Sequence, residues 1–183
     1  MSDFFSSYFS GLAEALVSVA PDDLLAATDL VERVGGSGRK VIIVGNGGSA
    51  AIASHVAVDL TKAAGVRAVT FHDPGLITCY ANDYGYENWV AEAIGSYADE
   101  GDAAILISSS GCSENIVNGS ITATELGLPV ITFSGFEATN PLRSMGEVNF
   151  WVDSSDYNVV ETTHQIWLLA VVDCLIDRSV VTT

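Results

Sequence analysis

Five short apolar runs, separated by segments with helical patterning, constrain the fold more than any other feature of the sequence. Each run is rich in β-branched or aromatic residues; the runs are 40–45, 67–72, 103–108, 129–134 and 148–153. Apolar residues recur at helical spacing between them, in segments 49–64, 86–97, 114–126 and 157–178, with a shorter one near 138–145. Strands that are apolar on both faces and alternate with helices are typical of a parallel sheet covered on both sides. We therefore predict an α/β fold, a three-layer α/β/α sandwich with a five-stranded parallel sheet and flavodoxin-like winding.

Two further helices are predicted ahead of the first strand, over residues 3–18 and 21–34. Apolar residues make up 49% of the 183 residues, which is rich for a chain of this size and favours additional burial between subunits. We predict one domain over 1–183, with a helical pair at 1–36 used in oligomer packing and an α/β core at 37–183.

Charge and cysteine content exclude several classes of protein. The net charge of −16 would repel nucleic acid. No apolar run reaches the roughly 18 residues that span a membrane, and the N-terminus lacks a basic segment, so we expect neither a membrane partner nor a secretory signal. The three cysteines are odd in number and widely spaced, which argues against disulfides and structural zinc and favours the cytoplasm.

Two polar loops follow predicted strands and precede predicted helices, the arrangement in which backbone N–H groups bind anions. The first is "GNGGSA" at 45–50, and the second is "SSSGCSEN" at 108–115. The alternative for each loop is an ordinary turn that binds no ligand. We favour phosphate binding, most strongly at the serine loop, because parallel sheets bind ligands at the carboxyl ends of their strands.

Nucleotide sites fit this pattern less well. A magnesium-nucleotide site needs a lysine or metal-binding carboxylates near the phosphates, and Lys62, the only lysine within the helix after the glycine loop, lies more than three turns along that helix. A dinucleotide site needs a third glycine that "GNGGSA" lacks, although Asp73 after the second strand keeps a weak nicotinamide-cofactor alternative open.

The segments "VGNGGSAAIASHVAVDL", "CYANDYGYENWV" and "ISSSGCSENI" resemble the SIS (sugar isomerase) domain family, and within it the sedoheptulose 7-phosphate isomerase (phosphoheptose isomerase) branch. The resemblance covers nearly the whole chain. It implies a homotetramer with sites between subunits and ketose–aldose isomerisation of a sugar phosphate through an enediol(ate), in heptose and surface-polysaccharide precursor synthesis. It also implies substrate or phosphate contacts from Asn46, Gly47, Gly48, Ser49, Asp83, Ser108, Ser109, Ser110 and Ser113.

The sequence departs from this branch at its catalytic positions. The branch carries His-x-x-x-Glu after the glycine loop, where this chain has His55 and Asp59, and Glu161 replaces a glutamine in the closing helix. His164 matches the first histidine of that helix, and Leu169 stands where the second is expected. We take Asp59 and Glu161 as candidate bases and His164 as a candidate acid. No cofactor is required, but the branch can carry zinc, for which His55, Asp59 and Glu161 are the candidate ligands.

Each of these residues also has a structural interpretation. His55 and His164 could be hydrogen-bonded interior histidines, Asp59 a helix-surface acid, and Glu161 a stabiliser of the helix dipole. For the whole chain, the alternative to an isomerase is a non-catalytic SIS protein that binds a phosphosugar or assembles a partner, of the replication-initiator-associating type. The missing second histidine favours that alternative, whereas the intact serine loop and the retained carboxylates favour the enzyme.

Overall fold

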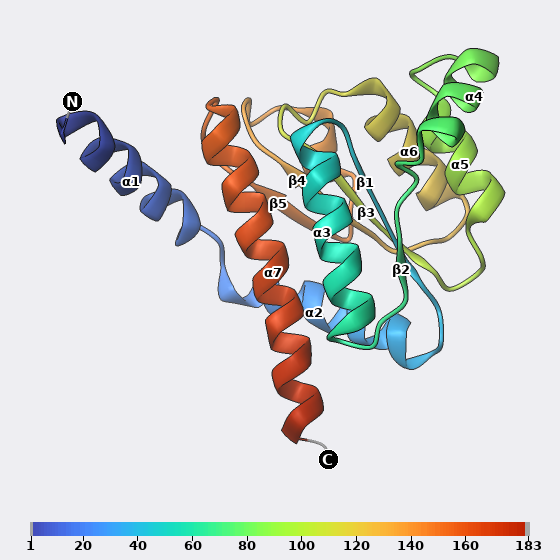
Figure 1. The fold of residues 1–183 in the computed structure, drawn as a ribbon, viewed down its shortest axis with the longest axis horizontal. Helices are drawn as coiled ribbons and strands as arrows, with labels where there is room; N and C mark the ends of the chain where they lie inside the picture. Colours follow the sequence, from blue (N-terminus) through green and yellow to red (C-terminus); the bar gives the residue numbers. More distant parts are fainter. Residues whose placement is uncertain (1, 182–183) are drawn as a thin grey trace.

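Five parallel strands form one sheet covered by helices on both faces in the computed structural model of the chain, which describes residues 2–181 (Figure 1). The strands lie in the order β2-β1-β3-β4-β5 and are β1 (Val41–Gly45), β2 (Ala68–Val69), β3 (Ala103–Ser108), β4 (Val130–Ser134) and β5 (Val148–Trp151). The chain reverses its direction of winding between β1 and β3, which places a ligand crevice at the carboxyl ends of these two strands. The predicted three-layer α/β/α sandwich is confirmed.

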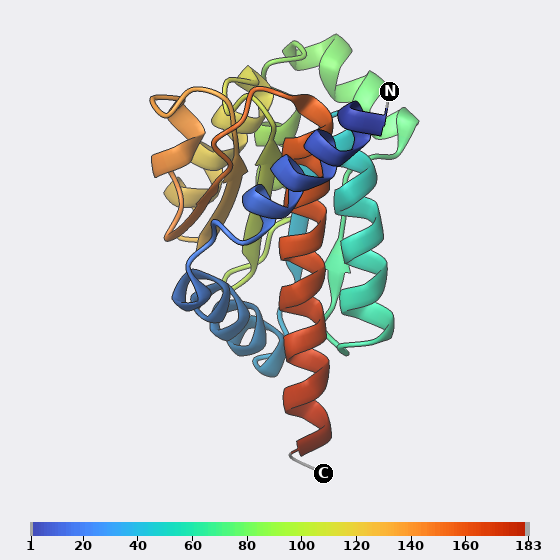
Figure 2. The same ribbon diagram turned by 90° about the vertical axis from the view of Figure 1, so that its left-hand side faces the viewer.

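The helices divide between the two faces of the sheet. On one face lie α2 (Pro21–Gly36), α3 (Gly48–Lys62) and α7 (Tyr157–Val181), with α1 (Ser2–Leu16) packed on α7. The other face carries α4 (Pro74–Tyr84), α5 (Trp89–Tyr97), α6 (Glu114–Glu125) and the 3₁₀ turn η1 (Pro141–Ser144). Figure 2 shows α1 crossing the upper part of α7, whose C-terminal end extends beyond the body of the molecule.

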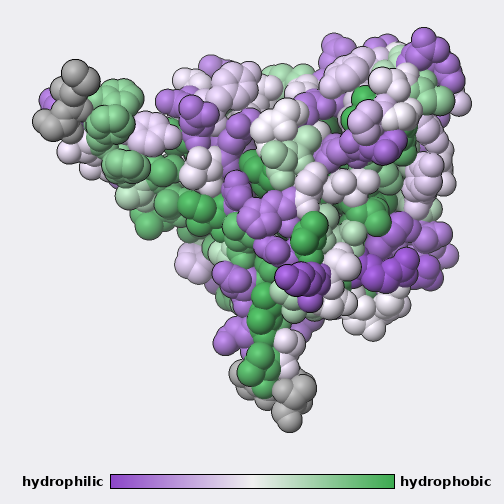
Figure 3. All heavy atoms as spheres, viewed as in Figure 1, coloured by the Kyte–Doolittle hydropathy of each residue, from purple (hydrophilic) through white to green (hydrophobic). Residues whose placement is uncertain are grey.

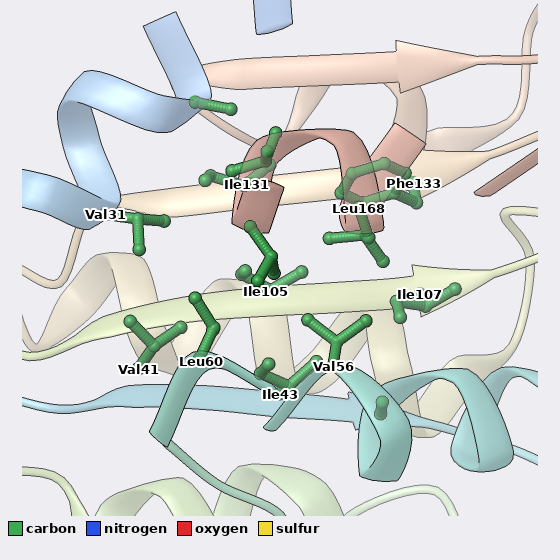
Figure 4. Packing of buried hydrophobic residues seen from close by; sticks show 14 of the residues in the cluster. Val31, Val41, Ile43, Val56, Leu60, Ile105, Ile107, Ile131, Phe133 and Leu168 are labelled. Carbon is green, nitrogen blue, oxygen red and sulfur yellow. The ribbon is translucent and has the colours of Figure 1, made fainter. Parts of the chain in front are cut away.

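Alternate residues of each strand feed two separate hydrophobic cores. Val41 and Ile43 of β1 pack toward α3 and α7, as Figure 4 shows, whereas Ile42 and Val44 pack toward the α4–α6 side. All four side chains are fully buried, and burying an aliphatic side chain stabilises a fold by about 1.5–3 kcal/mol. This explains why the strands are apolar without alternation.

The structure differs from the sequence prediction around the second strand. Only Ala68 and Val69 pair with β1, because the chain then leaves the sheet edge for a helix that we did not predict, α4. Asp73 begins this helix by accepting hydrogen bonds from the Gly75 and Leu76 amides, and Pro74 occupies its first turn. Helix α5 begins at Trp89 and not at residue 86 as predicted.

Helix α7 is long and apolar enough, by length and composition alone, to cross a membrane. Its Trp167, Leu168 and Val171 are nevertheless buried in the core, where α7 packs against α1, α2 and α3. These contacts are those of a core helix.

Candidate functional site

The glycine and serine loops meet at the carboxyl ends of β1 and β3. These strands pair in parallel with Gly45 beside Ile107, so the loops that follow them emerge side by side. Between them lies a cavity of about 270 Å³, lined by Asn46, Gly47, Gly48, Ser49, Ile107, Ser108, Ser109, Ser110, Ser113, Tyr157 and Glu161. Eight of the nine residues that the resemblance assigned to substrate or phosphate therefore share one cavity in the structure.

The glycine loop needs glycine for two different reasons. Gly47 caps α3 with a φ of 54°, a conformation that side chains disfavour. Gly48 lies against the carboxylate of Glu161, and a Cβ at position 48 would overlap that carboxylate. The loop therefore makes room for an acidic side chain delivered by α7.

Of the four serine hydroxyls in the serine loop, two donate their protons to other side chains and two do not. Ser108 Oγ donates to Ser113 Oγ at 3.0 Å, and Ser109 Oγ donates to Glu161 Oε1 at 3.3 Å. Because a hydroxyl has one proton, Ser110 and Ser113 keep theirs for a ligand. Ser110 Oγ also accepts from the Cys112 amide at 3.2 Å, which shapes the turn. Ser113 precedes the first residue of α6, whose N-terminus favours an anion.

Glu161 is the residue whose carboxylate lies in this cavity. It lies in the second turn of α7, which carries it over the start of α3 and beside Ser109. A carboxylate next to hydroxyl donors and a helix N-terminus is well placed to accept a proton from a bound ligand.

Asn46 connects the cavity to a second hollow. Its amide exchanges two hydrogen bonds with Asn115, of 3.0 Å and 2.9 Å, and its Oδ1 also accepts from the Tyr86 hydroxyl at 3.2 Å. The second hollow, of about 400 Å³, is lined by Asn46, Tyr86, Glu87, Ser113, Glu114 and Asn115. Tyr86, Asn115 and Tyr157 were not predicted as site residues, although Tyr86 belongs to the "NDYGY" segment and Asn115 to the serine-loop segment.

Asp83, predicted to contact substrate, does not line the cavity. Its carboxylate accepts from the side-chain amide of Asn82 at 2.8 Å and lies 3.8 Å from the Cys79 thiol, on exposed α4. From the same segment, Tyr86 reaches the site instead.

His164, the candidate acid, lies in the core and not in the cavity. Its ring is fully buried, with Nε2 2.9 Å from the Ser134 carbonyl oxygen and the edge of the ring against Phe133. Burial lowers the pKa of His164 to about 4. At neutral pH it is therefore uncharged and closed off from any ligand in this cavity, as the interpretation of a hydrogen-bonded interior histidine requires.

His55 and Asp59 form a separate pair on the outer face of α3. His55 Nε2 lies 3.1 Å from Asp59 Oδ2, and Gln165 of α7 lies 3.0 Å from His55 Nδ1. Asp59 is eleven residues beyond Gly48, about 16 Å along the helix, so in one chain it does not share a ligand with Glu161.

The predicted metal ligands are therefore not brought together. Within residues 2–181, no three His, Cys, Asp or Glu side chains are grouped so that they could hold a metal ion. Both ring nitrogens of His55 have protein partners, and Leu169 offers no ligand atom. This donor set does not fit the zinc ion that the resemblance allowed.

His72 contacts both the first residue of the glycine loop and helix α3. Its Nε2 lies 3.1 Å from the Gly45 carbonyl oxygen and its Nδ1 3.3 Å from Ser54 Oγ. Burial lowers the pKa of His72, as expected for a histidine that is neutral and structural.

Together the fold and the cavity define a class: a doubly wound α/β domain with a cavity lined by glycines and hydroxyls at its central strand ends. Residues 4–135 match the model of the SIS domain, and the chain belongs to this family. Among its relatives, phosphoheptose isomerase of Helicobacter pylori is 30% identical over 177 residues, covering 93% of this chain and 91% of that protein. Phosphoheptose isomerase of Halorhodospira halophila is 30% identical over 185 aligned positions, covering 97% and 91%.

A solved structure agrees with these relatives. The phosphoheptose isomerase from Francisella tularensis superposes with a TM-score of 0.85 at 26% identity, covering 96% of this chain and 97% of that one. Nearly the whole chain therefore has the architecture of that protein.

Proposed function

We propose that this chain is a sugar-phosphate isomerase that interconverts a ketose and an aldose through an enediol(ate), with sedoheptulose 7-phosphate as its substrate. Its product is an aldose phosphate of the kind used to build heptose for surface polysaccharide. The observation that carries the proposal is the position of the Glu161 carboxylate in the same cavity as the serine loop. The relatives named phosphoheptose isomerase support it and do not favour the non-catalytic alternative.

The phosphate binds at the serine loop in this proposal. Ser110 and Ser113 donate their free hydroxyl protons, and the start of α6 favours the negative charge. Lysine and arginine are absent from the cavity lining, which agrees with the idea that backbone amides and hydroxyls supply the attraction.

Glu161 is the base. It removes the proton from the hydroxyl-bearing carbon beside the ketone, which gives the enediolate, and returns it to the former carbonyl carbon. The hydroxyl proton passes from one oxygen to the other, so that the carbonyl moves by one position. Ser109 holds one carboxylate oxygen at 3.3 Å and leaves the other for the substrate. Asp59, the other candidate base, pairs with His55 outside the cavity of its own chain.

The assembly proposed is a homotetramer in the cytoplasm, with the number of subunits taken from the resemblance. Its support in the structure is α1, which leaves Phe4, Phe5 and Phe9 more than half exposed. Figure 3 shows hydrophobic residues along this arm and along the end of α7. All three cysteines are free thiols, as expected in a reducing compartment.

Proton transfer to carbon tests the proposal directly. The protein is incubated with sedoheptulose 7-phosphate and other ketose phosphates in deuterated water, with and without zinc. Deuterium on carbon at the isomerised position supports the isomerase. A sugar phosphate that binds without any exchange would show a binding protein instead.

Two isosteric variants then assign the base. We expect Glu161→Gln to lower kcat by about 10²-fold or more, since general-base catalysis contributes about 10²–10⁴-fold. Asp59→Asn is the matched comparison, another carboxylate changed to its amide on a neighbouring helix. Normal turnover in Glu161→Gln would remove Glu161 from this role.

A further inference from the structure

Asn46 lines both hollows of the site, and its side-chain oxygen is already saturated. Oδ1 accepts one hydrogen bond from Asn115 Nδ2 at 2.9 Å and another from the Tyr86 hydroxyl at 3.2 Å. An amide oxygen has two lone pairs, so neither remains for a ligand.

The nitrogen of the same amide donates only one of its two protons within the protein. Nδ2 has two protons, of which one is donated to Asn115 Oδ1 at 3.0 Å. In this orientation of the amide, Asn46 offers a ligand one N–H donor and no acceptor.

Asn115 is suited to hold this arrangement in place. Its side chain is 2% exposed and belongs to the first turn of α6, so its amide has little freedom to turn. Tyr86 lies on the segment between α4 and α5 and donates its hydroxyl proton to Asn46 Oδ1. The residue after β1 is thus fixed by two elements that pack on the same face of the sheet.

We infer that Asn115 and Tyr86 are positioning residues that fix Asn46 as a hydrogen-bond donor to the carbonyl oxygen, and then the enediolate oxygen, of the bound sugar phosphate. This inference rests on the proposed function and deepens it. Glu161 presents carboxylate oxygens to the same cavity, so acceptor and donor are complementary: the carboxylate takes the carbon-bound proton while the amide N–H stabilises the charge that develops on oxygen.

Three variants separate this role from a structural one. Tyr86→Phe removes a donor to Asn46 at an exposed position, Asn115→Leu removes the reciprocal partner, and Asn46→Asp replaces the donor by an acceptor of the same shape. We expect kcat to fall about tenfold in the first two and about 10²-fold in the third, the loss seen when one oxyanion donor is removed. The inhibition constant of inorganic phosphate should stay within twofold in Tyr86→Phe and Asn115→Leu, because the serine loop is unchanged.

Two controls match the chemistry of these changes. Tyr84→Phe removes a hydroxyl from an exposed tyrosine at the end of α4, and Ser120→Ala removes a buried hydroxyl of α6 that has no partner among the described side chains. Neither should change kcat. The inference is overturned if Tyr86→Phe and Asn115→Leu keep wild-type kcat, or if their loss of kcat is matched by an equal weakening of phosphate binding.

A binding experiment separates failure of this inference from failure of the proposed function. A phosphorylated sugar hydroxamate, which mimics an enediolate, is titrated against wild type and variants by calorimetry. If the wild-type protein turns over no ketose phosphate, the proposed isomerase function is refuted. The donor role of Asn46 is then tested by hydroxamate binding alone. Tighter binding of hydroxamate than of phosphate by wild type, lost in Asn115→Leu and Tyr86→Phe, supports the role; equal binding by all proteins refutes it.

Discussion

The carboxylate of Glu161 lies against the backbone of Gly48, which makes this glycine a sensitive position. In Gly48→Ala the new methyl group would displace the carboxylate from its place beside Ser109. We expect kcat to fall at least tenfold while the fold persists, because alanine favours a helix over glycine by about 1 kcal/mol and offsets part of the strain. Kinetics and thermal unfolding check this, with Gly36→Ala, at a helix position with open space, as the control. Wild-type kcat in Gly48→Ala would mean that Glu161 does not act from this position.

His164 gives the protein a defined acid sensitivity. Its pKa is lowered to about 4 in the fold, from 6.5, so the unfolded chain binds its proton first as the pH falls. Its contribution to stability is complete above pH 6.5 and is lost as the pH falls toward 4. Between pH 7.5 and pH 5 we expect this residue to lower the free energy of unfolding by about 2 kcal/mol.

Urea unfolding of wild type and His164→Gln at the two pH values measures this contribution. The His164→Gln variant should lose less free energy of unfolding on acidification than the wild type does. Equal losses in wild type and His164→Gln would contradict the assignment.

Helix α4 is stabilised mainly by its N-terminal cap, because it buries little side-chain surface. It has no fully buried residue, and the Asp73 carboxylate satisfies two amides of its first turn. We expect Asp73→Ala to destabilise this helix by about 1 kcal/mol and to speed amide hydrogen exchange over 75–84. Asp73→Asn keeps a capping oxygen and should exchange at the wild-type rate. Slow exchange in Asp73→Ala would show that packing, and not the cap, holds α4.

The same helix shows why part of the fold could be predicted from sequence and part could not. The buried strands β1, β3 and β4 are recognisable because both of their faces are apolar. Helix α4 leaves only partly buried side chains on the core, so its apolar pattern is weak, and the Asp73-Pro74 start signal was the one clue available.

The position of the site could be predicted from the sequence, but the neighbours of the side chains on α7 could not. Residues that directly follow β1 and β3 had to converge, since parallel strands end at one edge. On α7, however, residues three or four positions apart face different neighbours: Glu161 the cavity, His164 the Ser134 carbonyl oxygen, and Gln165 the His55 ring. Sequence spacing gives their angle around the helix but not which neighbour each angle meets.

At the scale of the whole molecule, the net charge of −16 opposes the arrival of an anionic substrate. The chain has only seven lysines and arginines against 23 acids, and Arg178 is already paired with Asp29 and Glu32. Two acids, Glu87 and Glu114, line the hollow beside the serine loop. A sugar phosphate must therefore approach through a field that repels it until local donors take over.

Salt should consequently speed this enzyme at low substrate concentration. As ionic strength rises from about 0.02 M to 0.5 M the screening length falls from about 20 Å to about 4 Å, and we expect kcat/KM to increase several-fold with little change in kcat. The double variant Glu87→Gln/Glu114→Gln should raise kcat/KM at low salt and flatten its salt dependence. Asp22→Asn with Asp23→Asn, two acids at the start of α2, removes the same charge without lining the hollow and should do less. A fall of kcat/KM with added salt would mean that local donors dominate the encounter even at long range, and that the acidic surface does not control access to the site.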